Sequence, residues 1–263
     1  WMREALRLAR RGRGGTSPNP MVGAVLVRHG KIIGRGWHRR AGLAHAEVNA
    51  IEDALKNGHA TRGATLFVTL EPCSTHGRTP PCTQAIVDAG IGRVIVAATD
   101  PNPSHAGRAF QKLRRKGVAV EHGLLAEPAA ELNASFNHWI TNDLPLVTVK
   151  AAMTLDGKIA TASGESKWIT GPSARRQGMK LRHEADAIVV GVNTILADDP
   201  SLTVRDVRRP KPEWRGPELR RIVLDPRARI PLDARVLNDE LAPATTVVVS
   251  ADAPTKRLVK LKA

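Results

Sequence analysis

Tyrosine is absent from this 263-residue chain, and aromatic residues make up only 3% of it. Such a chain has few side chains on which nucleic-acid bases could stack, which argues against the nucleic-acid partner that its net charge of +15 would suit. No apolar run approaches the roughly 20 residues of a membrane span, and no secretory signal opens the chain. We therefore expect a cytoplasmic protein that binds neither nucleic acid nor a membrane. A cationic field that gathers small phosphorylated substrates explains the charge equally well, as does a generally basic surface.

Cysteine is also scarce, because Cys73 and Cys82 are the only two in the chain. They follow the tripeptide His45-Ala46-Glu47, and imidazole and thiolate are ligands that zinc prefers. Three protein ligands leave one tetrahedral position for water, and Glu47 could move protons for that water. This is the H-x-E and P-C-x-x-C signature of zinc deaminases, here with a wider spacing between the cysteines. The sequence therefore predicts a hydrolytic zinc site with His45, Cys73 and Cys82 as ligands and Glu47 as the catalytic proton carrier.

The same residues leave other interpretations open. The two cysteines could form a disulfide or be inert buried thiols, although nothing in the sequence suggests an oxidising compartment. A nucleoside or tRNA deaminase would carry a similar site. A basic nucleic-acid-binding module would close the zinc site with a fourth protein ligand, for which His76 is the obvious candidate. An interaction protein with a decayed catalytic domain would have lost Glu47 or a ligand, and none is lost.

Strand-like and helix-like runs alternate along the chain, which is typical of an α/β sandwich with helices on both faces of a sheet. A polar turn at 142–145 separates a predicted deaminase-type domain, residues 1–142, from a second α/β domain at 145–263. We predict strands at 22–27, 31–37, 65–70, 93–98, 118–121, 146–152, 187–191, 221–225 and 245–249. We predict helices at 2–11, 45–56, 82–89, 106–116, 127–140, 170–183 and 193–197, and an exposed loop at 205–218.

Two of these helices are predicted to begin at candidate zinc ligands. His45 and Glu47 do not share one face of a helix, so both serve one site only at a helix N-terminus, where the first turn points several groups into the same space. Two prolines precede Cys82, and proline suits the first turn of a helix. The positive end of that helix would favour the thiolate form of Cys82.

Stretches in both halves of the chain closely resemble the bifunctional deaminase–reductase family of riboflavin biosynthesis. In the first half the resemblance rests on residues 18–25, on His45-Ala46-Glu47 and on the tract 73–82. The Gly-Arg-Thr-Pro-Pro segment between the cysteines distinguishes this family from cytidine and tRNA adenosine deaminases. In the second half the resemblance rests on residues 150–160, 163–170 and 186–200.

The resemblance implies an N-terminal cytidine-deaminase-like α/β/α sandwich and a C-terminal dihydrofolate-reductase-like α/β domain, in a homo-oligomer. It implies one Zn²⁺ in the deaminase site and NADPH in the reductase domain. The first reaction would be hydrolytic deamination of 2,5-diamino-6-(5-phosphoribosylamino)pyrimidin-4(3H)-one, a small phosphorylated pyrimidine. The second would be NADPH-dependent reduction of its ribosyl group to ribityl.

The resemblance also implies residues around each substrate. In the deaminase domain, Asn19 would lie at the pyrimidine ring. Further candidates for ring or phosphate contacts there are His76, Arg78 and Asn102. In the reductase domain, the residues around the substrate would be Ser166, Arg182, Leu202 and Arg205. Those around NADPH would be Ala152, Trp168, Thr194 and Asp198. Lys150 is a candidate for orienting the ribosyl oxygen.

The family's reductase domain continues to a glycine-rich turn that holds the phosphates of the cofactor, whereas this chain ends at Ala263. It also opens on Trp1 rather than on methionine. These features predict a piece of a longer chain with an incomplete reductase domain. We expect this chain to deaminate, and to bind NADPH weakly or not at all.

Overall fold

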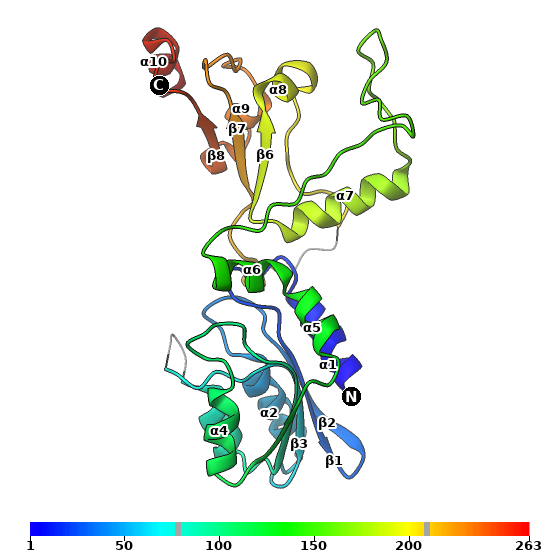
Figure 1. The fold of residues 1–263 in the computed structure, drawn as a ribbon, viewed down its shortest axis with the longest axis vertical. Helices are drawn as coiled ribbons and strands as arrows, with labels where there is room; N and C mark the ends of the chain where they lie inside the picture. Colours follow the sequence, from blue (N-terminus) through cyan, green and yellow to red (C-terminus); the bar gives the residue numbers. More distant parts are fainter. Residues whose placement is uncertain (77–79, 208–210, 263) are drawn as a thin grey trace. The chain divides into compact units, whose positions relative to one another are not determined.

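The structure of the chain, a computed structural model, describes residues 1–76, 80–207 and 211–262 (Figure 1). The Cα atoms group into two compact units. The first unit comprises Trp1–Thr148 with Arg209–Gly216, and the second comprises Val149–Arg208 with Pro217–Ala263. The first unit is therefore discontinuous in sequence, whereas the sequence predicts two continuous domains. No helix within the described ranges is long and apolar enough to cross a membrane.

The first unit is built on a five-stranded sheet of order β2-β1-β3-β4-β5. The strand β1 pairs antiparallel with both β2 and β3, whereas β3, β4 and β5 run parallel to one another. Parallel neighbours end at the same edge of a sheet, so the segments that follow β3 and β4 leave the sheet side by side. The strands are β1 (Gly23–Arg28), β2 (Lys31–Trp37), β3 (Thr65–Leu70), β4 (Arg93–Ala98) and β5 (Ala119–His122).

Helices cover both faces of this sheet, as predicted (Figure 1). Successive side chains of β1 point to opposite faces, so Ala24 and Leu26 join one core cluster while Val25 and Val27 join the other. The helices of the first cluster are α2 (Ala46–Lys56), α3 (Cys82–Asp88) and α4 (Arg108–Arg115). The second cluster is covered by α1 (Met2–Ala9), which continues as the 3₁₀ turn η1 (Arg10–Gly12), and by α5 (Ala126–Leu132).

Two glycines let α2 lie directly against β2. A Cβ atom at Gly34 would lie 2.1 Å from the carbonyl oxygen of Ala50, and one at Gly36 would lie 2.1 Å from that of Ala46. Real Cβ atoms do not approach a backbone so closely, so any larger residue would force the helix away from the strand. The alternating glycines therefore fix the distance between β2 and the first turn of α2.

The single helix predicted at 127–140 is wrong, because the structure has two helices there, α5 and α6 (Ala134–Asn142). The chain turns between them at Asn133, whose backbone is not helical. Asn133 is buried, and its side chain accepts a hydrogen bond from the amide of Met21 (2.8 Å) and donates one to the carbonyl of the same residue (3.0 Å). This pairing between residues 112 positions apart outweighs the local preference for one continuous helix.

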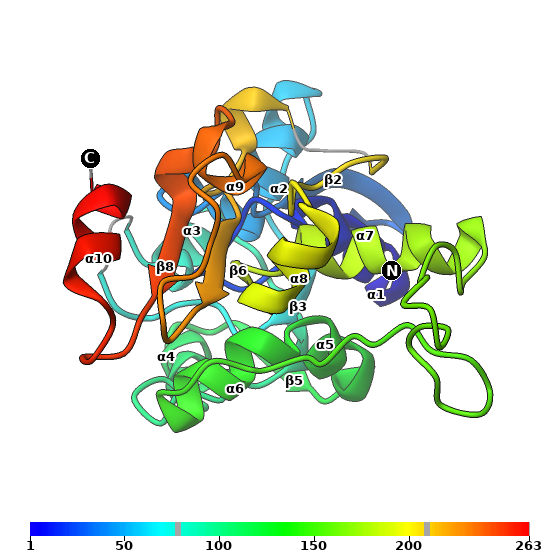
Figure 2. The same cartoon turned by 90° about the horizontal axis from the view of Figure 1, so that it is seen from above.

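The second unit contains a three-stranded parallel sheet of order β6-β7-β8. The helix α8 (Val192–Asp198) follows β6 directly and lies at the carboxyl end of that strand (Figure 1), and Figure 2 shows the same elements from above. The fully buried Arg221 in β7 makes a bidentate ion pair with Asp239, at 2.7 Å for each contact. The strands are β6 (Ala187–Gly191), β7 (Arg220–Leu224) and β8 (Thr245–Val248). The remaining elements are α7 (Pro172–Glu184), α9 (Arg235–Asn238), α10 (Thr255–Lys262) and the 3₁₀ turns η2 (Pro212–Trp214) and η3 (Ala242–Ala244).

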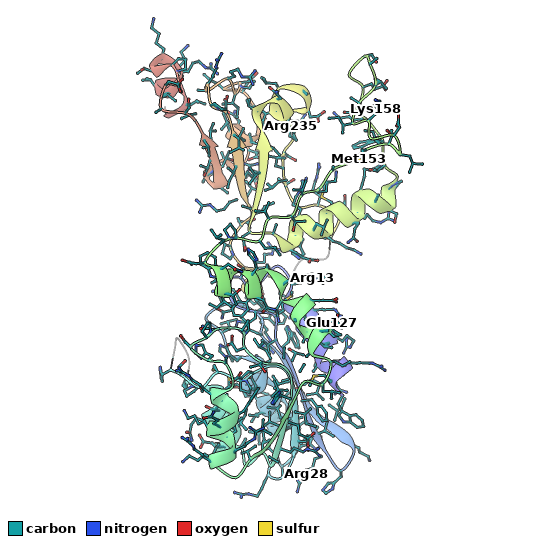
Figure 3. All side chains as sticks on the ribbon, viewed as in Figure 1. Arg13, Arg28, Glu127, Met153, Lys158 and Arg235 are labelled. Atoms are coloured by element: carbon teal, nitrogen blue, oxygen red, sulfur yellow. The ribbon has the colours of Figure 1, made fainter. Side chains whose placement is uncertain are left out.

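The strand predicted at 146–152 is also wrong. Residues 146–152 form no regular element, and the side chains of Val147 and Val149 are 76% and 87% exposed. A strand forms only where its backbone N–H and C=O groups meet a neighbouring strand, and none of the described strands pairs with this segment. Met153 and Lys158 lie further along the same irregular stretch, away from the three-stranded sheet (Figure 3).

The loop predicted as exposed at 205–218 is exposed along most of its described length, but Trp214 is half-buried. Its ring meets that of Trp37 edge to face at 6.0 Å, and the guanidinium group of Arg39 lies over both rings. This cation–π cluster explains why residues 211–216 group with the first unit.

Candidate metal centre and active site

Three side chains from separate elements converge at one end of the first unit. His45 is the N-cap of α2, Cys73 follows the end of β3, and Cys82 is the first residue of α3. The Nδ1 atom of His45 lies 3.6 Å from Sγ of Cys73 and 3.2 Å from Sγ of Cys82. All three candidate ligand atoms lie within 4.8 Å of one another. The two helices begin where the sequence predicts, so the helix starts bring these side chains together.

This arrangement fits a zinc ion. One imidazole nitrogen and two sulfur atoms are a donor set that zinc prefers, and their separation suits neighbouring corners of a tetrahedron. Both cysteines are free, so the disulfide interpretation is wrong. Within the described residues, no fourth His, Cys, Asp or Glu belongs to the group, and His76 lies outside it. These three ligands leave the fourth position that a hydrolytic site needs.

The two thiols are electrostatically distinct. A hydrogen bond with the Cys82 side chain lowers the pKa of Cys73 to about 4, and His45 and the Cys82 amide at 3.2 Å add to this effect. The same hydrogen bond, together with burial, raises the pKa of Cys82. The two sulfur atoms therefore interact directly, and binding of a divalent cation would release a proton from the pair.

Glu47 lies in the first turn of α2 and is only 3% exposed. Burial raises the pKa of its carboxyl group to about 7, with the charge on Cys73 acting in the same direction. The carboxyl group also interacts with the Cys82 side chain, which places it beside the ligand cluster. A carboxyl group with a pKa near 7 can both accept and donate a proton at neutral pH.

Asn19 is connected to this cluster by His38, which contacts both Asn19 and His45. The sequence alone does not identify His38 as a site residue. Nδ1 of His38 lies 3.2 Å from the carbonyl oxygen of Ala44, which can only accept, so Nδ1 carries the ring proton. Nε2 then accepts a hydrogen bond from the side-chain amide of Asn19 at 3.1 Å. Burial lowers the pKa of His38 to about 4, in keeping with a neutral ring. The amide nitrogen of Asn19 is thus engaged, whereas its side-chain oxygen has no hydrogen-bond partner in the described part of the chain and can accept from a ligand.

His38 also packs edge to face against His45, with ring centroids 5.2 Å apart. Its only sequence signal is its place directly after β2, at the sheet edge that faces α2.

The remaining residues predicted to contact the substrate of this domain are spread over two loops. Asn102 lies in the loop after β4, and His76 is an exposed residue of the loop that follows Cys73. Arg78 falls outside the described residues.

Three of the four residues predicted around the reductase substrate come together in the second unit. Arg182 donates to the carbonyl of Thr203 at 2.8 Å, beside the buried Leu202. Burial, and then the charge of Arg205, lower the pKa of Arg182. Two guanidinium groups held close together favour an anion between them. Within the described ranges, no hydrogen bond joins Ser166 to this group.

The residues predicted around NADPH are less tightly grouped. Asp198 in α8, the helix that also carries Thr194, pairs with Lys167 at 3.2 Å. Trp168 follows Lys167, is 72% exposed, and has the guanidinium group of Arg175 over its ring at 4.5 Å. Ala152 is half-buried in the irregular segment, and Lys150 lies with its side chain close to α7.

The sandwich fold and the three-ligand site with a buried glutamate define a zinc-dependent deaminase domain, joined in one chain to a second α/β domain. Comparison with known families agrees for both parts. The cytidine and deoxycytidylate deaminase zinc-binding region matches residues 1–98, and the RibD C-terminal domain matches residues 145–263.

Individual relatives indicate which family within this class the chain resembles. Riboflavin biosynthesis protein RibD of Aquifex aeolicus is 49% identical over 98% of this chain and 70% of its own length. The RibD protein of Escherichia coli is 50% identical over 78% of this chain and 55% of its own length. The structure of Acinetobacter baumannii RibD superposes with a TM-score of 0.86 at 41% identity, covering 99% of this chain and 71% of that one. A deaminase/reductase from Thermotoga maritima superposes with a TM-score of 0.84, also at 41% identity, over 96% and 70% of the two chains.

The chain belongs to the RibD family of riboflavin biosynthesis enzymes, and both the zinc-binding deaminase domain and the NADPH-dependent reductase domain of that family are represented in it. It spans between 55% and 70% of the length of four curated relatives from this family.

Proposed function

We propose that the first unit removes the 2-amino group of 2,5-diamino-6-(5-phosphoribosylamino)pyrimidin-4(3H)-one by hydrolysis and releases ammonia. The observation that carries this proposal is the convergence of His45, Cys73 and Cys82 with the buried carboxyl group of Glu47 beside them. Family membership supports the choice of substrate, because the Thermotoga maritima relative is described as a diaminohydroxyphosphoribosylaminopyrimidine deaminase.

In this mechanism His45, Cys73 and Cys82 would hold the zinc ion. Zinc in such a site lowers the pKa of water, so that hydroxide is available near neutral pH. The water oxygen bonds to the carbon that carries the 2-amino group, while Glu47 takes a proton from this water and delivers it to the adjacent ring nitrogen. Glu47 then takes the proton of the added hydroxyl group and passes it to the amine, which leaves as ammonia as its bond to that carbon breaks and the carbonyl forms. A pKa near 7 suits Glu47 to both transfers.

Asn19 would orient the pyrimidine ring. Because His38 engages the amide nitrogen of Asn19, the Asn19 oxygen faces the ligand as a hydrogen-bond acceptor. An acceptor favours a ring that carries amino or N–H groups over one that presents a carbonyl at the same place. The substrate has such groups, which supports placing its ring at Asn19.

The second unit would serve the reduction of the ribosyl group. Arg182 and Arg205 suit its phosphate, with Leu202 and Ser166 completing the substrate contacts. Trp168, Thr194, Asp198 and Ala152 would line the NADPH site, and Lys150 would orient the ribosyl oxygen. Free thiols as ligands favour a reducing compartment, which supports a cytoplasmic location. A homo-oligomeric state and the absence of a nucleic-acid partner also belong to the proposal.

The test measures zinc content and ammonia release for the purified chain, with cytidine as a control substrate. We expect one zinc ion per chain and release from the diaminopyrimidinone only. Glu47→Gln should keep its zinc and lose at least about 10²-fold in kcat, because the amide cannot carry the proton. Glu127→Gln is the matched control, since Glu127 projects from α5 on the surface (Figure 3). Ammonia release by Glu47→Gln at the rate of the parent chain would refute the proton-transfer role.

A further inference from the structure

Glu71 is a buried carboxylate that no part of the proposed chemistry uses. It follows β3 directly and is 5% exposed. Its Oε2 atom accepts hydrogen bonds from the amides of Asp100 (3.2 Å) and Gly107 (2.9 Å), and its Oε1 atom accepts one from Ala109 (3.0 Å). One side chain therefore binds both ends of the loop between β4 and α4, residues 100–107. Hydrogen bonds to an ionised acceptor are stronger than neutral ones, so this loop is firmly held.

The loop that Glu71 holds lies at the same edge of the sheet as the candidate zinc ligands. Glu71 and Cys73 both follow β3, and the loop 100–107 follows β4, its parallel neighbour. The amide of Glu71 bonds to the carbonyl of Ala98 at 2.9 Å, which keeps the two strand ends together. A second link comes from Lys112 in α4, which donates to the carbonyl of Ser74 at 3.1 Å. Ligands of α/β sheets bind at the carboxyl ends of parallel strands.

Two successive Asx turns, in each of which a side-chain oxygen accepts a hydrogen bond from the amide two residues later, fix the orientation of Asn102 within this loop. The amide of Asn102 donates to Asp100 Oδ1 at 2.9 Å, and Asn102 Oδ1 accepts from the amide of Ser104, also at 2.9 Å. The oxygen of the Asn102 carboxamide is thus engaged. Its nitrogen has no hydrogen-bond partner among the described residues, so a hydrogen-bond donor is available to a ligand at the sheet edge.

We propose that Glu71 is a positioning residue, which holds the loop 100–107 so that Asn102 donates to the ribosyl phosphate arm of the substrate. This inference rests on the proposed deaminase function and adds a specificity element to it. The pyrimidine ring lies at the zinc ligands, and the arm attached to it extends over the neighbouring strand end. Glu71 therefore acts on substrate binding, whereas Glu47 acts on proton transfer.

Glu71→Gln tests this division of roles. A glutamine side chain offers one acceptor oxygen, and its NH₂ group would face at least one backbone N–H, so one end of the loop is released. We expect KM for the phosphorylated substrate to rise about tenfold or more, while kcat and zinc content stay near those of the parent chain. The preference for the phosphorylated substrate over its dephosphorylated form should fall by a similar factor. Glu131→Gln, an exposed change in α5, is the matched control and should alter none of these values.

Asn102→Ala keeps the test decisive if Glu71→Gln does not fold. Asn102→Ala should raise KM by a comparable factor, and the double variant should show no further rise, because both changes remove one interaction. An unchanged KM in Asn102→Ala, or in folded Glu71→Gln, would overturn the proposal. So would a loss of zinc from Glu71→Gln, because Glu71 would then support Cys73 rather than the loop. Absence of ammonia release from the zinc-loaded parent chain would instead reject the proposed function, and this inference with it.

Discussion

Replacing Gly36 with alanine tests whether the spacing between β2 and α2 sets the position of Glu47. The new Cβ would lie 2.1 Å from the carbonyl oxygen of Ala46 and 2.4 Å from the amide nitrogen of Ala50. Both atoms belong to the backbone of α2, so no side-chain rotation relieves the contact and the start of the helix must move by roughly 1 Å. Overpacking of this kind costs about 1–3 kcal/mol. A displacement of roughly 1 Å at a catalytic group costs about 10²-fold in rate.

Thermal unfolding, zinc content and ammonia release are the three measurements for Gly36→Ala. We expect a melting temperature lower by several degrees, and a kcat reduced about 10²-fold even in protein that retains its zinc. Gly92→Ala is the matched control, because a Cβ there would meet only Gly63, at an ordinary 3.5 Å. It reports the general effect of alanine on the unfolded chain without the clash. If Gly36→Ala unfolds at the same temperature as Gly92→Ala and deaminates normally, the close approach does not position Glu47.

Two further changes examine the ligand set and the loop that carries Asn19. Cys82→Ser should lose most of its metal, because a hydroxyl group is a far weaker zinc ligand than a thiolate. Full zinc occupancy of this variant, measured by elemental analysis, would show that Cys82 is not a ligand. Asn133→Ala should lower the free energy of unfolding in urea by about 1–3 kcal/mol, because it leaves the partly buried amide and carbonyl of Met21 without their side-chain partner. An unchanged unfolding midpoint would contradict that reason.

Much of the first unit could be predicted from sequence because its signals are local. The run at 65–70 consists of Thr, Leu, Phe and Val, which suit a strand, and it forms the largely buried strand β3. The pair of prolines before Cys82 marks the start of α3, and the strand–turn–strand pattern around residue 29 forms the hairpin of β1 and β2. The candidate ligands were found in the same way, because their residue types and spacing are chemical signals that do not depend on long-range packing.

The errors arose where distant residues decide the local conformation. Asn133 ends a helix because Met21, far away in sequence, offers it an N–H and a carbonyl. The segment 146–152 has the apolar residues of a strand, yet it lacks a neighbouring strand among the described residues. The partial burial of Trp214 depends on Trp37 and Arg39, which no pattern near residue 214 indicates. His38 was missed for the same reason, because its importance lies in contacts with Asn19 and His45.

Glu47 and Glu71 show why residue type alone does not identify the acid–base group of this site. Both glutamates are buried, and each lies two residues from a candidate zinc ligand. Glu71 accepts hydrogen bonds from three backbone N–H groups, and these bonds hold a loop. Among the described residues Glu47 has one backbone donor, its own amide, and burial raises its pKa to about 7. The carboxylate whose lone pairs are engaged by three backbone donors is suited to holding structure, whereas the one that is desolvated with a single backbone donor is suited to moving protons. The two roles are therefore separated by hydrogen bonding, which only the folded chain supplies.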